Sequence, residues 1–286
     1  MKIIEATNAG FFANLCDALR HIYIAERDGE EWYVNWGPES LYYDESVGLN
    51  AFDYFFEQKE RPEFSSLHTY VRGYVDIDVR IKGYENDLFT TGSSFRNTLS
   101  RLINEHLKYK HVVNTKYNSI ISLIDPGKTL GVHIRYTDKY NGKAFGEPAS
   151  AEPIPLKIYI HLAQQCMKYN MYEHIYLATD CAHAAREFSQ VFGSKLVMIQ
   201  APRSETNEPI HSGHSHISGF YKGLSVLLDA LVLSRCDYLI RGTSNVSSFA
   251  QFIDTNLKHV NLNEVLMGDY REHQYGLFSS DYDNFL

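Results

Sequence analysis

The sequence has few cysteines and no long apolar run, and both absences restrict what the protein can be. Its four cysteines lie far apart in 286 residues and form no Cys-x-x-Cys pair, so neither zinc-ligand spacing nor a disulfide framework is expected. No apolar segment approaches the ~20 residues of a membrane span, and the polar start of the chain is unlike a signal peptide. We therefore expect free thiols and a soluble, cytoplasmic protein.

Positive charge is also scarce. Lys and Arg total 27 against 35 for Asp and Glu, a net charge of −8. A nucleic-acid scaffold normally carries a basic stripe, so we expect no nucleic-acid partner, although a small basic pocket for phosphates is compatible with this balance.

Recognisable metal-ligand patterns are missing as well. Asp76 and Asp78 have Asp-x-Asp spacing but lie in a segment without clear periodicity. His211, His214 and His216 fit no common ligand pattern and have no acidic residue adjacent to them. We expect these histidines to belong to a loop near the active site, and we expect no metal and no other cofactor.

Strands and helices alternate along most of the chain, which predicts an α/β fold with parallel sheets. A strand at 2–6, a turn in which Gly10 is free to adopt positive φ, a helix at 13–27 and a strand at 31–36 open the sequence. A further helix is expected at 95–109. After a turn at 125–128, the expected strands are 130–134, 174–178, 196–199, 238–240 and 259–262, and the expected helices are 156–169, 182–192, 221–234 and 246–253.

The turn at 125–128 suggests where the chain divides. We predict a first domain at 1–120, a second at 121–270, and a tail at 271–286 that is either loose or packed back on the first domain. Ligands of an open parallel sheet bind at the carboxyl ends of its strands, so the residues at those ends are the candidates for chemistry.

The first strand end carries His133 and Arg135, which alternation places on the same face as Gly131. Arginine offers forked donors to phosphate oxygens, histidine can add another donor, and the glycine would allow close approach. This pattern suits a diphosphate, with ordinary polar surface residues as the alternative.

Two further strand ends carry polar residues. For Asp180 a helix N-cap is the favoured interpretation, and a place near a nucleotide base or ribose, with Thr179, is the alternative. Thr243, Ser244 and Asn245 open a helix whose free N–H groups and dipole favour a phosphate, although capping alone would explain Ser244 or Asn245.

Asp229 lies inside an otherwise apolar helix and therefore needs a partner, either within the fold or in a ligand.

Four segments in order resemble one family. Val132-His-Ile-Arg-Tyr-Thr-Asp-Lys139 is similar to the His-x-Arg-Arg-Thr-Asp-Lys segment of α1,6-fucosyltransferases, shared in looser form by the nodulation and protein O-fucosyltransferases. The stretches 174–180, 228–245 and 8–15 resemble further blocks of the same family. The resemblance implies a GT-B fold, with two Rossmann-like domains of parallel sheets and an active-site cleft between them.

The resemblance also implies roles for individual residues. It implies an inverting, metal-independent transfer of fucose from GDP-fucose to a hydroxyl of a glycan acceptor. His133 and Arg135 would hold the diphosphate, and Gly10 with Phe11 would belong to the loop that approaches it. Asp229 would serve the guanine pocket, and Ser244 and Asn245 would bind phosphate from the helix start.

The sequence departs from the family at two positions. Tyr136 replaces a second arginine, and Lys143 replaces a glutamate, so the catalytic base does not transfer. Glu147 and Glu152 are the candidate bases, with Asp138 behind them. Three alternatives follow: another GDP- or UDP-linked donor such as UDP-xylose, a nucleotide- or glycan-binding module without catalysis, and a different α/β enzyme with a similar strand end.

Overall fold

The computed structural model describes residues 1–75, 77, 93–137, 154–206, 208–210 and 216–266. The first part of the chain forms a three-stranded sheet of order β2-β1-β4, in which both neighbouring pairs are parallel. Its elements are β1 (Lys2–Glu5), α1 (Phe11–Arg27), β2 (Trp32–Asn35) and β4 (Thr69–Arg72).

The second sheet has five strands in the order β10-β9-β6-β7-β8, and all four pairings are parallel. Its strands are β6 (Thr129–Ile134), β7 (His174–Thr179), β8 (Leu196–Val197), β9 (Tyr238–Arg241) and β10 (Lys258–Asn261). The helices of this part are α4 (Leu156–Tyr169), α5 (Ala182–Phe192), α7 (Gly219–Leu233), α8 (Asn245–Ile253) and α9 (Leu262–Leu266). The expected α/β class with parallel sheets is confirmed.

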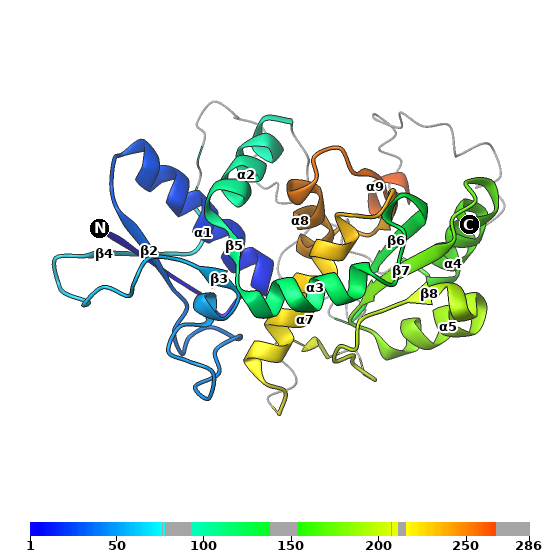
Figure 1. Cartoon of the computed structure of the whole chain (residues 1–286), viewed down its shortest axis with the longest axis horizontal. Helices are drawn as coiled ribbons and strands as arrows, with labels where there is room; N and C mark the ends of the chain where they lie inside the picture. Colours follow the sequence, from blue (N-terminus) through cyan, green and yellow to red (C-terminus); the bar gives the residue numbers. More distant parts are fainter. Residues whose placement is uncertain (76, 78–92, 138–153, 207, 211–215, 267–286) are drawn as a thin grey trace.

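Shorter elements and two helices connect the sheets. The short strands β3 and β5 pair antiparallel. These connecting elements are η1 (Ala51–Tyr54), β3 (Phe56–Glu57), α2 (Ser93–His106), β5 (Lys108–Tyr109), α3 (His111–Ile121), η2 (Pro126–Lys128) and η4 (Gly193–Lys195). Figure 1 shows α3, α7 and α8 between the two sheets.

Two expectations about the first part of the chain were wrong. Gly10 has φ −63° and is the N-cap of α1, so it does not need the left-handed region. The helix begins at Phe11 rather than at residue 13. Helix α3 was not expected, because Val113 is its only buried residue and its sequence carries little apolar periodicity.

The two faces of β6 have different neighbours, as its alternation predicted. Leu130, Val132 and Ile134 pack in the apolar cluster that includes residues of α4. A Cβ atom on Gly131 would lie 3.2 Å from Leu233, at the end of α7, and 3.2 Å from Cys236, in the turn after α7. This glycine therefore makes room for α7, and its expected role in phosphate approach is replaced by a packing role.

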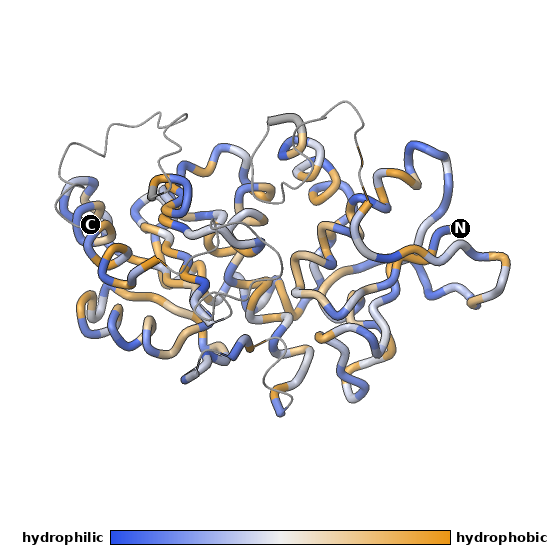
Figure 2. Tube along the Cα trace, turned by 180° about the vertical axis from the view of Figure 1, so that it is seen from behind, coloured by the Kyte–Doolittle hydropathy of each residue, from blue (hydrophilic) through white to orange (hydrophobic). Residues whose placement is uncertain are grey.

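One of the two apolar clusters connects the two sheets. One cluster of buried side chains includes residues of α1, α7 and α8. The rings of Phe12 and Phe249 stack with their centroids 4.5 Å apart. At the start of α7, a Cβ on Gly219 would lie 2.5 Å from the Tyr43 carbonyl oxygen. In Figure 2, apolar segments alternate with hydrophilic ones along both parts, as amphipathic elements around a common core require.

Candidate active site

Four of the predicted residues, His133, Arg135, Thr179 and Asp180, lie at the carboxyl edge of the second sheet. His133 of β6 is in register with Ala178 of β7 and Arg241 of β9. Residues in register on neighbouring strands share a face, so these three lie on the α7 face of the sheet. His133 is buried, and Arg135 follows just after the strand.

Asp180 holds Arg135 and the two residues after it. Its carboxylate pairs with the Arg135 guanidinium at 3.1 Å. It also accepts hydrogen bonds from the Tyr136 N–H at 3.0 Å and from the Thr137 hydroxyl at 2.8 Å. The N-cap of α5 is Cys181, without a side-chain bond, so the favoured N-cap interpretation of Asp180 was wrong. Its three contacts instead orient the segment that carries Arg135.

A loop of the first part faces Arg135. Burial raises the pKa of Tyr42 to about 12, and the nearby guanidinium of Arg135 opposes this rise. The Tyr42 hydroxyl oxygen accepts a hydrogen bond of 2.8 Å from the N–H of Phe11, at the start of α1. A Cβ on Gly10 would meet nothing within 4 Å. The structure therefore brings Gly10, Phe11 and Arg135 into one region, with open space beside the glycine.

The start of α8 is tied into the fold by several hydrogen bonds. Ser244 is its N-cap and accepts from the Val246 N–H at 3.4 Å. The Thr243 N–H donates to the Asn263 side chain at 2.7 Å, and the Asn261 amide donates to the Thr243 hydroxyl at 3.1 Å. Capping thus accounts for Ser244, and the side chain of Thr243 bonds within the protein.

Asn245 and Thr179 are the remaining predicted residues at helix starts. Asn245 opens α8 and is partly buried. Thr179 is buried, and its hydroxyl accepts from the Cys181 N–H at 3.2 Å, which stabilises the turn between β7 and α5.

Asp229 finds its partner within the fold. Its carboxylate accepts a hydrogen bond of 2.8 Å from the Tyr176 hydroxyl. Burial raises the pKa of Asp229 to about 7, although Tyr176 and the charge of Arg203 lower it, and the charge of Asp180 raises it further. Asp229 is therefore close enough to Asp180 to sense its charge, on the same face of the sheet as His133.

Sequence reasoning missed Arg241. Its side chain is fully buried although it stands at the carboxyl end of β9, in register with His133. The available signal was a charged residue directly after the apolar strand positions 238–240. Its position beside His133 depends on the order of the strands in the sheet.

Some candidates lie outside the described residues. They are Asp76, Asp78, Asp138, Lys143, Glu147, Glu152, His211 and His214. His216 lies in the described part and lines an open pocket of about 460 Å³ with Tyr43, Asp44 and Lys222.

Metal-ligand geometry occurs once among the described residues, away from this site. Glu26, Glu105 and His106 bring ligand atoms within 4.8 Å of one another on the surface. Arg101 already pairs with both glutamates there, so ion pairs account for the cluster. No helix in the described ranges is long and apolar enough to cross a membrane.

Comparisons with known proteins agree on the fold. No protein-family model and no curated protein matches the chain. A crystal structure of fucosyltransferase NodZ from Bradyrhizobium has a TM-score of 0.53 and 17% identity over 91% of this chain and 94% of that one. A structure of NodZ α-1,6-fucosyltransferase soaked with GDP-fucose has a TM-score of 0.52 and 17% identity over 88% of this chain and 92% of that one. A structure of POFUT1 in complex with GDP-fucose has a TM-score of 0.52 and 9% identity over 91% of this chain and 97% of that one. The chain has the GT-B fold of these fucosyltransferases, as the sequence resemblance implied.

Proposed function

We propose that the protein is a glycosyltransferase that moves a sugar from a nucleotide donor to a hydroxyl of a glycan acceptor. The observation that carries the proposal is the placement of Arg135. Asp180 holds its guanidinium at the carboxyl edge of the sheet, opposite the loop at Phe11. This edge is where open α/β sheets bind ligands, and a guanidinium there matches a diphosphate.

The proposed reaction is an inverting, metal-independent transfer. The acceptor oxygen forms a bond to the anomeric carbon while the bond from that carbon to the diphosphate breaks on the opposite face. Arg135, His133 and the N–H groups at the start of α8 stabilise the negative charge that develops on the leaving diphosphate. A carboxylate takes the acceptor proton, and Glu147, Glu152 and Asp138 remain the candidates.

GDP-fucose is the donor that we propose. The NodZ crystal named above was soaked with GDP-fucose, the POFUT1 structure is a complex with it, and the chain has their fold. Asp229 and Tyr176 would lie at the base pocket, and Thr179 and Asp180 beside it. Another GDP- or UDP-linked sugar, such as UDP-xylose, uses the same diphosphate chemistry and is the alternative donor.

The acceptor side is proposed for the first part of the chain, residues 1–120, and the donor side for residues 121–270. The open pocket between Tyr43, Asp44, His216 and Lys222 is lined by residues of both parts. Its polar lining offers hydrogen-bond donors and acceptors to a glycan.

A binding module without catalysis is the second candidate, and Tyr136 favours it. The family segment has a second arginine at this position, and its loss removes one positive charge from the site. The contact of Tyr136 with Asp180 is through its backbone N–H, which every residue except proline could supply.

The test combines a nucleotide panel with a matched pair of arginine variants. Thermal shifts with GDP, UDP and their sugar derivatives identify the donor, and release of sugar without acceptor separates an enzyme from a binder. Arg135→Ala should lower transfer about 100-fold or more. Arg186→Ala should leave it unchanged, because Arg186 forms an exposed pair with Glu205. An active Arg135→Ala variant would contradict the assignment.

A further inference from the structure

A buried positive charge lies beneath the start of α8 and has little to balance it. Arg241 is 0% exposed, and its Nε and Nη1 atoms have no hydrogen-bond partner among the described residues. The third nitrogen, Nη2, lies 4.0 Å from a carboxylate oxygen of Glu264, which is 49% exposed. Burying a guanidinium with two unsatisfied nitrogens destabilises the fold, so packing alone does not explain why this residue is an arginine.

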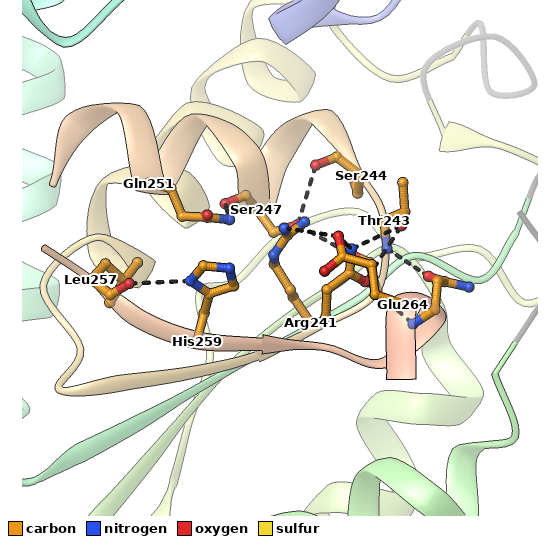
Figure 3. A network of polar contacts seen from close by, with 11 residues as sticks. Arg241, Thr243, Ser244, Ser247, Gln251, Leu257, His259 and Glu264 are labelled. Atoms are coloured by element: carbon orange, nitrogen blue, oxygen red, sulfur yellow. Dashed lines mark hydrogen bonds and ion pairs between the residues drawn. The ribbon is translucent and has the colours of Figure 1, made fainter. Parts of the chain in front are cut away.

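The neighbours of Arg241 add positive potential to it. Figure 3 shows its guanidinium group next to the first turn of α8, near Ser244 and Ser247, with Glu264 on another side. The N-terminus of a helix carries partial positive charge and disfavours a cation there. Burial lowers the pKa of Arg241 to about 10; Glu264 opposes this shift, and the charge of Arg96 adds to it.

No other described group supplies the missing negative charge. His259, on the adjacent strand β10, has its pKa lowered to about 3, first by burial and then by the charge of Arg241, so it is neutral near pH 7. The side-chain amide of Asn261 in β10 donates a hydrogen bond of 2.5 Å to the Glu264 carboxylate. The same carboxylate oxygen therefore serves both Asn261 and, at 4.0 Å, Arg241.

We infer that Arg241 is a positioning residue whose buried charge raises the affinity of the site beside it for the diphosphate of the donor. This inference rests on the proposed function and adds to it. Because the side chain is fully buried, it acts through its electric field and not by contact. The bound diphosphate would provide the negative charge that the described residues do not supply. The cost of burying Arg241 would then be offset on binding.

Three variants separate this field effect from a structural role. Arg241→Met keeps much of the volume and removes the charge, Arg241→Lys keeps the charge, and Glu264→Gln removes the opposing carboxylate. Affinities for GDP, GMP and guanosine are measured by titration calorimetry, with UDP in parallel, together with the Tm of each unliganded protein.

Arg241→Met should weaken GDP binding about tenfold, weaken GMP less and leave guanosine unchanged. Its unliganded Tm should rise by about 2–4 °C, because an unbalanced buried charge is removed. Arg241→Lys should retain most of the GDP affinity, and Glu264→Gln should increase it about twofold to threefold. Opposite effects of the Met and Gln variants are not expected from a residue that only supports the fold.

Two results would overturn the inference. Equal losses of GDP and guanosine affinity in Arg241→Met, with a lowered Tm, would show a structural role. Unchanged or weakened GDP binding in Glu264→Gln, with Arg241→Met unaltered, would show that the charge does not reach the site. A wild-type protein that binds neither GDP nor UDP would instead overturn the proposed function, and this inference with it.

Discussion

Asp180 offers a sharp test of how the site is organised, because one carboxylate holds three consecutive residues. Asp180→Ala removes the partner of the Arg135 guanidinium and the acceptors of the Tyr136 N–H and the Thr137 hydroxyl. Thr137 is 1% exposed, so its hydroxyl cannot turn to water without moving the backbone. The segment should lose its fixed position, and Arg135 should lose its orientation at the proposed diphosphate site.

The size of the effect follows from the three contacts. The two hydrogen bonds have neutral donors and a carboxylate acceptor, and each contributes about 1.5 kcal/mol net, the low end for bonds to a charged group. The pair with Arg135 is partly exposed and contributes about 0.5–1 kcal/mol more after screening by solvent. The free energy of unfolding should fall by about 2–4 kcal/mol, and Tm by about 5–10 °C.

Urea denaturation and GDP titration calorimetry measure the two consequences separately. Asp180→Ala should lower both stability and GDP affinity. Asp237→Ala is the matched control, because its carboxylate accepts one hydrogen bond of 2.8 Å from Tyr172 at the opposite end of the sheet. The control should lose about 1.5 kcal/mol of stability and keep its GDP affinity. GDP binding that survives Asp180→Ala intact would refute the idea that Asp180 orients Arg135.

Two further predictions concern α7. Gly219→Ala should lower the free energy of unfolding, measured by urea denaturation, by about 2–4 kcal/mol, because the new Cβ would lie 2.5 Å from the Tyr43 carbonyl oxygen. The control Gly10→Ala places its Cβ where nothing lies within 4 Å and should lower it by under about 1 kcal/mol. Equal losses in the two variants would contradict the close contact at Gly219. Since burial raises the pKa of Asp229 to about 7, the folded protein holds this proton more tightly than the unfolded chain, and wild-type stability should fall as the pH rises from about 4 to about 7. In Asp229→Asn, the free energy of unfolding should decrease by about 1–3 kcal/mol less over this pH range than in the wild type. A variant with the same pH profile as the wild type would show that Asp229 is not the group responsible.

Local patterns were enough to predict much of the second sheet. Helices α4 and α5 begin and end where periodicity placed them. The alternation in β6 correctly separated the two faces of the strand. These features depend on neighbours in the sequence, which is why they could be read without the fold.

The errors at the site have a different origin. Asp180 stands where an N-cap would stand, but its partners come from the segment just after β6, more than 40 residues earlier in the chain. Asp229 needed a partner, and only the packing of α7 on β7 identifies it as Tyr176. Arg241 is in register with His133 because β6 pairs with β9, and no local pattern predicts that pairing. Side chains at strand ends could be proposed from the sequence, but their contacts depend on strand order.

A crystal structure with bound GDP would test the central claim most directly. We expect the diphosphate at the carboxyl edge of the second sheet, with its oxygens within about 3 Å of the Arg135 guanidinium and of backbone N–H groups at the start of α8. The loop at Gly10 and Phe11 should face the same diphosphate. A nucleotide bound at the opposite edge of the sheet, or one whose phosphates make no contact with Arg135, would contradict this account.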